Sequence, residues 1–121
     1  RNYSYSVRLM WRTRQRWKKF KRWIRFLGQR LWRGWDDSET WNLERTIAKF
    51  ALPRLIRFKE LNNGFPNDMT PEEWDAALDD IIFAMQDLNS GAQYESTDPA
   101  TAARVQRGLL RFGTSFSDLW W

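Results

Sequence analysis

The sequence contains no cysteine and no histidine among its 121 residues. The absence of cysteine excludes disulfide bonds and thiolate nucleophiles, and the absence of histidine excludes the usual general base of enzymes. Zinc, iron and copper sites, which use these two side chains in most proteins, are excluded with them. We therefore predict a non-enzymatic protein with no catalytic residue, no metal site and no cofactor.

The sequence also lacks a long apolar run. Its longest uninterrupted apolar stretch, Ile81–Met85, has five residues, whereas a membrane span needs about 18. Arg and Lys punctuate the N-terminal region, which has neither the apolar segment nor the small-residue cleavage site of a signal peptide. We therefore predict that no segment of this sequence spans a membrane, and its first residues do not have the pattern of a signal peptide.

Acidic residues are absent from the first 35 positions, which carry 12 Lys or Arg. Residues 36–121 carry the other eight basic residues and all 15 acidic residues. This uneven distribution has two interpretations, to which we give equal weight. Either the basic region binds an external anionic partner, or the acidic region neutralises it inside the fold.

A periodic pattern runs through this basic region, which begins with a polar stretch and ends near Gly34. Apolar residues recur in steps of three and four, as on one face of a helix. This apolar seam comprises Met10, Thr13, Trp17, Phe20, Ile24, Leu27 and Leu31, of which Thr13 alone is polar. Basic residues flank the seam on both sides. We predict that residues 1–35 form a basic amphipathic helix, with Trp17, Phe20, Ile24 and Leu27 buried against the third and last helices.

The second helix is expected from near Glu39 to Leu61, after a cap at Asp37 or Ser38. Pro53 lies inside it, and proline removes one backbone donor and disfavours helical geometry at the preceding residue. We therefore predict a kink at Pro53, or two short abutting helices. Gly64, which suits a left-handed cap, is expected to end the segment.

Two further helices have clear start signals. Thr70-Pro71-Glu72-Glu73 combines a capping residue, a proline at the first helical position and the glutamate of a capping box. Asp98-Pro99 opens the last helix by the same logic. Residues 89–97, rich in Ser, Gly and Asn, are predicted to form a flexible loop between the two helices.

No segment combines alternation of period two with the turn residues of a hairpin. The predicted fold is therefore all-α, a compact bundle of four to five helices in a single domain of residues 1–121. The terminal pair Trp120-Trp121 is expected to dock on this bundle, because two indole rings are costly to leave in water.

The acidic residues of the third helix include Asp75 and Asp79, which lie four apart and so on one face, and the adjacent Asp80. This spacing is compatible with a divalent ion, but helical carboxylates without a partner motif more often form a solvated face. We favour the solvated face.

Basic residues on three helices are the candidate ligand-binding residues. Arg side chains pair with phosphates bidentately, and Trp and Arg planes stack on bases. The candidates are Arg14, Lys18, Lys21, Arg22 and Arg25 in the first helix, Arg54 and Arg57 in the second, and Arg104, Arg107 and Arg111 in the last. If these faces converge, they make a multi-arginine anion pocket. A solvated face, a membrane-surface role and docking on an acidic protein remain open.

Several short segments resemble a family of small proteins encoded by tailed bacteriophages. These segments are Asp37–Glu44, Pro53–Leu55, Arg57–Glu60, Thr70–Asp75, Gly108–Gly113 and Leu119-Trp120. The similarity extends from about Trp35 to the C-terminus and omits the basic helix. It rests on helix caps and core positions, so it implies a viral origin and the cytoplasm of an infected bacterium, but no activity and no site residue.

These observations predict a non-enzymatic phage accessory protein that binds a phosphate-bearing ligand through Arg, Lys and Trp side chains. The ligand is either a nucleic acid or a signalling nucleotide that is sequestered as counter-defence. The alternative is a structural or interaction protein that docks on a virion or host protein. The sequence leaves oligomerisation open.

Overall fold

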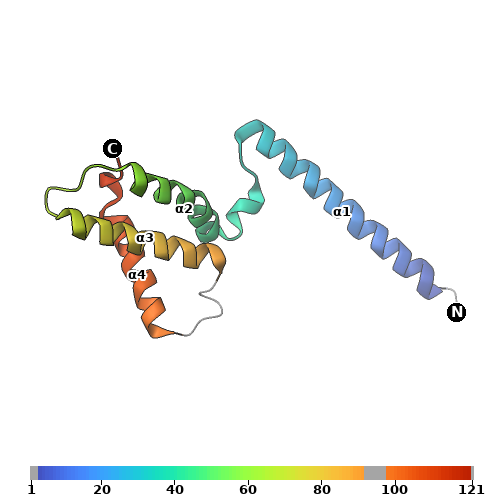
Figure 1. The fold of residues 1–121 in the computed structure, drawn as a ribbon. Coiled ribbons are helices and arrows are strands. Elements are labelled where there is room, and N and C mark those ends of the chain that lie inside the picture. The colour runs from blue at the N-terminus through green and yellow to red at the C-terminus, as the bar shows by residue number, and fades with distance from the viewer. Residues whose placement is uncertain (1–2, 92–97, 121) are drawn as a thin grey trace. The chain divides into compact units, whose positions relative to one another are not determined.

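The computed structural model describes residues 3–91 and 98–120, with side chains from residue 8 onward in those ranges. Every regular element within these ranges is helical, which confirms the all-α fold (Figure 1). The elements are α1 (Tyr3–Arg33), the 3-10 helix η1 (Asp37–Thr40), α2 (Leu43–Leu61), α3 (Pro71–Ser90), α4 (Pro99–Thr114) and the 3-10 helix η3 (Phe116–Asp118).

The chain divides into two compact units, unit 1 (Arg1–Trp41) and unit 2 (Asn42–Trp121). Unit 1 contains α1 and η1, and unit 2 contains α2, α3, α4 and η3. The structure defines each unit by itself, so the single domain of residues 1–121 stays a prediction.

Helix α1 has 31 residues and is about 46 Å long at about 1.5 Å per residue. It ends at Gly34, which has a φ of 83° and whose N–H donates to the carbonyl of Arg30 over 2.8 Å. Only glycine adopts this left-handed conformation without a steric penalty. The sequence therefore predicts both the helix and its end correctly.

The hook, residues Gly34–Trp41, folds back against the C-terminal turns of α1. Asp36, only 1% exposed, caps η1 by accepting from the Ser38 N–H over 2.8 Å. Glu39 completes a capping box at the backbone N–H of Asp36. The cap predicted at Asp37 or Ser38 for the second helix is therefore wrong, because Asp36 caps η1 and the second helix begins only after Asn42.

Aromatic and polar contacts attach the hook to α1. Phe26 is buried beneath the edge of Trp41, with ring centroids 5.6 Å apart. Gln29 exchanges two hydrogen bonds of 2.8 Å with the side chain and the backbone N–H of Asp37. The hook therefore covers one side of α1 near its C-terminal end.

Helix α2 begins at Leu43 and not near Glu39, because the turn of η1 and the hook precede it. It runs through Pro53 without a break. The predicted pair of short abutting helices is therefore wrong, and the kink at Pro53 stays a prediction. The helix ends at Asn62, whose N–H donates to Phe58 over 2.8 Å. The left-handed cap predicted at Gly64 is also wrong, because Gly64 has no positive φ.

Helix α3 begins with the predicted capping box. The Thr70 side chain accepts from the Glu73 N–H over 3.1 Å, and the Glu73 carboxylate accepts from the Thr70 N–H over 2.9 Å. The helix extends to Ser90 and ends at Gly91, which has a φ of 75°. Positions 89 and 90 are therefore helical and not loop, and positions 92–97 of the predicted loop lie outside the described residues.

Helix α3 is the central element of unit 2 and packs on both α2 and α4. Its predicted core face is confirmed, since four of the five predicted residues are buried and the fifth packs half-buried against them. These residues are Trp74, Leu78, Ile81, Met85 and Leu88. Ala48 and Leu55 of α2 and Val105 of α4 extend the core to both neighbours. Unit 2 thus builds its core from its own three helices.

Helix α4 begins at the predicted cap Asp98, whose side chain accepts from the Ala100 N–H over 3.2 Å. At Gly108 it touches the backbone of α3: a Cβ placed on this residue would lie 2.2 Å from the carbonyl oxygen of Asp80. A glycine that weakens the helix in isolation is therefore the residue that lets α4 approach α3.

The apolar seam is largely open within unit 1, and its predicted burial against the third and last helices stays a prediction because the structure defines each unit by itself. Trp17 is 57% exposed, Phe20 and Ile24 are each 49% exposed, and Leu27 is 39% exposed. The core of unit 2 is filled without them. Trp120 is 75% exposed, so its predicted docking is wrong; Trp121 lies outside the described residues.

Candidate functional site

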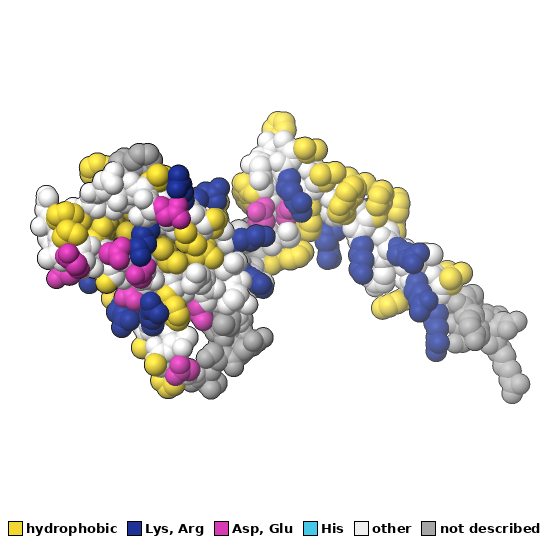
Figure 2. Space-filling view, in the orientation of Figure 1, with side chains coloured by type: hydrophobic (Ala, Val, Ile, Leu, Met, Phe, Trp, Pro, Cys, Tyr) yellow, Lys and Arg dark blue, Asp and Glu magenta, His cyan; other side chains and the backbone are white. Residues whose placement is uncertain are grey.

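The candidate site is the basic surface of α1. Nine Lys or Arg residues lie between Arg8 and Arg25, and no acidic residue lies in this interval. Figure 2 shows Lys and Arg side chains along one edge of α1 and hydrophobic side chains along the other. The described ion pairs of unit 1 lie after this interval, between Arg30 and Asp36 and between Arg33 and Asp37. The two ion pairs thus involve cations outside the interval. The hydrogen bond from Gln29 is the main cause that lowers the pKa of the Asp37 carboxylate, and within the interval Arg25 adds a smaller contribution.

Three aromatic side chains form a stacked row within this basic interval. The ring centroids of Trp17 and Phe20 lie 5.9 Å apart at 27°, and those of Phe20 and Trp23 lie 6.3 Å apart at 20°. All three rings are about half exposed. The ammonium group of Lys21 lies 5.3 Å from the centre of the Trp17 ring. This stacked row thus offers aromatic faces beside cations.

A second aromatic position lies two turns earlier on α1. Trp11, which is 66% exposed, lines a surface hollow of about 290 Å³ with Arg12, Gln15, Arg16 and Lys19. None of these three cations is among the predicted ligand-binding residues. Their spacing of three and four positions around an exposed Trp is the sequence signal that identifies them.

The five predicted ligand-binding residues of α1 share one helix. Arg14, Lys18, Lys21 and Arg25 follow one another in steps of four, three and four and are exposed. The guanidinium of Arg25 lies 5.3 Å from the Phe26 ring. Arg22 lies 6.0 Å from the Trp41 ring of the hook. The structure thus places these five side chains in one continuous array.

The predicted residues of α2 have partners on their own helix. Arg54 stacks on Phe50, 3.8 Å from the ring centre, and donates to the Phe50 carbonyl over 2.8 Å. Arg57 pairs with Glu60 over 2.8 Å. Both pairs are exposed, so they hold the two guanidinium groups only weakly.

Two of the three predicted residues of α4 pair with α3. The Nε atoms of Arg104 and Arg107 lie 3.2 and 3.0 Å from the carboxylate of Asp80, whose side chain is 19% exposed. The hydrogen bond from Arg107 is the main cause that lowers the pKa of Asp80, and Arg104 adds to it. Arg111 is exposed in the last turn. Asp80 therefore already neutralises part of the charge that a pocket would need.

Asp75 and Asp79 of α3 also have a basic partner. The ammonium of Lys59 lies 2.5 Å from Asp79 and 3.4 Å from Asp75 and joins α2 to α3. The hydrogen bond to Asp79 raises the pKa of Lys59, and Asp75 contributes less. These carboxylates are therefore part of the helix packing of unit 2. In the described part of the chain, no three acidic side chains gather as a metal site.

Helix α1 is too polar to cross a bilayer, and the same holds for each other helix within the described ranges. The array on α1 differs from the basic residues of unit 2 because its cations face solvent beside exposed rings. Comparison with protein-family models, with characterised proteins and with solved structures found no match to this chain.

Proposed function

We propose that the chain is a non-enzymatic protein that binds single-stranded nucleic acid through α1. One observation carries this proposal: the exposed stacked row of Trp17, Phe20 and Trp23 lies among exposed Lys and Arg residues. Proteins that bind single strands combine these two features, because the rings stack on unpaired bases and the cations contact phosphates.

The geometry favours an extended ligand over a compact nucleotide. The cations from Arg8 to Arg25 lie along about 26 Å of one helix, and the surface of a single helix does not enclose a small ligand. A pocket for a nucleotide would need the basic residues of unit 2, and Arg104 and Arg107 already bind Asp80. Sequestration of a signalling nucleotide is therefore the weaker form of the proposal.

The resemblance to phage proteins adds a context to this proposal. A phage accessory protein would encounter single-stranded nucleic acid in the cytoplasm of the infected bacterium. Since the resemblance omits the basic helix, the proposed binding element is the part of the chain that the resemblance does not explain.

Fluorescence anisotropy with labelled 20-nucleotide single strands, the matching duplex and a cyclic dinucleotide tests the proposal. We expect the single strand to bind most tightly. The logarithm of its binding constant should fall with the logarithm of the salt concentration, with a slope of about −0.7 for each phosphate contacted. Replacement of Trp17 and Trp23 by Ala should weaken single-strand binding by about 1–3 kcal/mol per stacked base. Equal affinity of the Trp variants and the parent would show that the rings do not stack on bases.

A second candidate function is docking on an acidic protein helix. The exposed apolar seam favours it, because its steps of three and four are those of a coiled-coil seam. Pairing with a second copy is disfavoured, since α1 has no acidic residue to oppose its own cations. A partner bound equally well after nuclease treatment would support this candidate, whereas binding to anionic lipid vesicles alone would indicate a membrane-surface role.

A further inference from the structure

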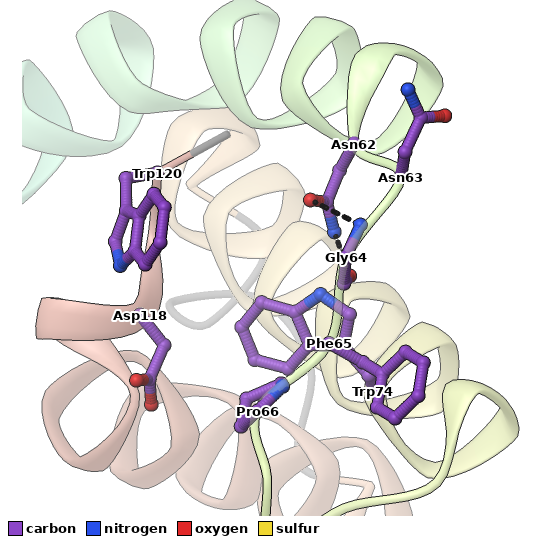
Figure 3. A pocket seen from close by; sticks show the side chains of 8 residues that line it. All are labelled: Asn62, Asn63, Gly64, Phe65, Pro66, Trp74, Asp118 and Trp120. Carbon is purple, nitrogen blue, oxygen red and sulfur yellow. Dashed lines mark hydrogen bonds between the residues drawn. The ribbon is translucent and has the colours of Figure 1, made fainter.

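Unit 2 contains a cavity that is lined only by residues of unit 2. The cavity measures about 270 Å³ and lies where the end of α2, the start of α3 and the segment after α4 meet. Figure 3 shows Asp118 and Trp120 on one side of it and the Asn62–Phe65 segment on the other, with Trp74 between them. The lining therefore combines three aromatic rings with one carboxylate and the Asn62-Asn63 pair.

Trp74 lines this cavity and is only 3% exposed. It forms a core cluster with Ala77 and Leu78, on which Phe58, Met69 and Leu119 pack. Its Nε1 has no hydrogen-bond acceptor among the residues that the structure describes. This nitrogen is itself buried, so the indole of Trp74 is a fixed part of the cavity wall and its N–H signal reports on what enters the cavity.

Asp118 brings an unpaired negative charge to the same cavity. The described part of the chain contains no ion pair for its carboxylate, which is partly buried. Next to it, the ring of Trp120 is 75% exposed, and Phe65 across the cavity is 51% exposed. A carboxylate beside exposed rings favours a planar organic cation, because such a cation pairs with the carboxylate and stacks on a ring.

We propose that this cavity binds an arginine side chain of a basic peptide. The guanidinium pairs with Asp118 and stacks on Trp120, and the indole of Trp74 lines the cavity beside them. Arginine fits better than lysine because its planar group stacks on rings and forms two parallel hydrogen bonds with a carboxylate. Unit 2 carries eight basic and 12 acidic residues, so its net charge also favours a basic peptide.

The test is an NMR titration of the full chain, labelled with ¹⁵N, with two small probes. One probe is arginine with an acetylated N-terminus and a methylamide C-terminus, and the other is citrulline blocked in the same way. Citrulline has the same shape without the charge. We expect the indole N–H signal of Trp74, identified by its loss in Trp74→Phe, to move with both probes. Arginine should bind about fivefold more tightly, as one partly exposed ion pair allows.

Two variants separate the contribution of the Asp118 carboxylate from that of the Trp120 ring. Asp118→Asn should abolish the preference for arginine and leave citrulline binding unchanged, and Trp120→Ala should weaken both probes. Because Trp120 is exposed, its replacement should not affect folding, so it keeps the test decisive if Trp74→Phe fails to fold. A Trp74 signal that neither probe moves would overturn the site. An arginine preference that survives Asp118→Asn would overturn the assigned role of the carboxylate.

Discussion

Gly108 shows how a single residue determines the packing of two helices. We expect Gly108→Ala to destabilise the protein by about 1–3 kcal/mol, the usual cost of overpacking. The added methyl group would lie 2.2 Å from the carbonyl oxygen of Asp80 and 2.7 Å from the Cβ of Ala84. Neither atom belongs to the end of a flexible side chain, so α4 must shift. Urea denaturation followed by circular dichroism measures the change.

Gly113→Ala is the matched control, because Gly113 lies on the same helix and its added Cβ would have nothing within 4 Å. Alanine favours the helix more than glycine, so this variant should be up to about 1 kcal/mol more stable. If both variants change stability in the same direction and by the same amount, the close approach at Gly108 has no special role.

The carboxylate of Asp80 makes the stability of unit 2 depend on pH. Arg107 and then Arg104 lower its pKa below the ordinary value of 3.8. The folded protein therefore holds this proton less tightly than the unfolded chain, and the stabilisation is present above about pH 4. It is lost as the pH falls through the lower pKa of the folded state.

Asp80→Asn isolates this contribution from the other carboxylates. The variant should be less stable than the parent at pH 7 by on the order of 1 kcal/mol, because the guanidinium partners are partly exposed. The difference should shrink as the pH falls from 4 to 2. Urea denaturation at several pH values measures it, and a difference that is constant with pH would refute the role of the ion pairs.

At the scale of the helices, the two faces of α1 need separate tests. We expect Arg14→Glu with Lys18→Glu to weaken binding of single-stranded nucleic acid by at least tenfold at low salt, because two phosphate contacts become repulsive. Both residues are exposed, so the fold should not change. Anisotropy titrations give the affinities, and circular dichroism verifies the helix content.

The control places the same change of charge on unit 2. Lys49→Glu with Arg57→Glu alters two exposed residues of α2 and changes the net charge of the whole chain equally. If this control weakens binding as much as the α1 variant, the effect comes from net charge or from Arg57 itself and not from a surface on α1.

Features that depend on local interactions can be predicted from the sequence, whereas contacts between distant residues cannot. The starts of α3 and α4 depend on caps at Thr70 and Asp98, which are local, and both are predicted correctly. The periodicity of α1 also predicts the helix. The same periodicity cannot say what covers an apolar seam, so the burial of Trp17 and its neighbours stays a prediction.

The candidate site shows the same limit. The sequence identifies Arg14, Lys18 and their neighbours because helical spacing places them side by side. It cannot reveal that Arg104 and Arg107 share Asp80, since that contact joins residues more than 20 positions apart. It also treats Gly108 as a weakness of α4, because the partner that needs the glycine lies on α3.

At the scale of the whole molecule, the two units differ in charge as well as in packing. Unit 1 carries 12 basic and three acidic residues, and unit 2 carries eight basic and 12 acidic residues. Unit 2 has a core of its own, whereas most large apolar side chains of α1 are exposed. We infer that folding and anion binding belong to different parts of the chain.

A chain of residues 42–121 tests this division. We expect it to fold alone and to melt within a few degrees of the full chain, because its core helices α2, α3 and α4 are all present. Trp17→Ala in the full chain should likewise leave the melting temperature unchanged, whereas a buried Trp would cost about 3–5 kcal/mol. Thermal melts followed by circular dichroism measure both.

The same shortened chain should lose its affinity for single-stranded nucleic acid, since the cations between Arg8 and Arg25 are gone and its acids outnumber its bases. It should still bind the blocked arginine probe at Trp74 and Asp118, which lie within residues 42–121. Loss of folded structure on removal of residues 1–41 would mean that the seam of α1 stabilises unit 2 after all. Retained nucleic-acid binding would instead move the site to unit 2, where Arg54, Arg57 and Arg111 would be the residues to replace next.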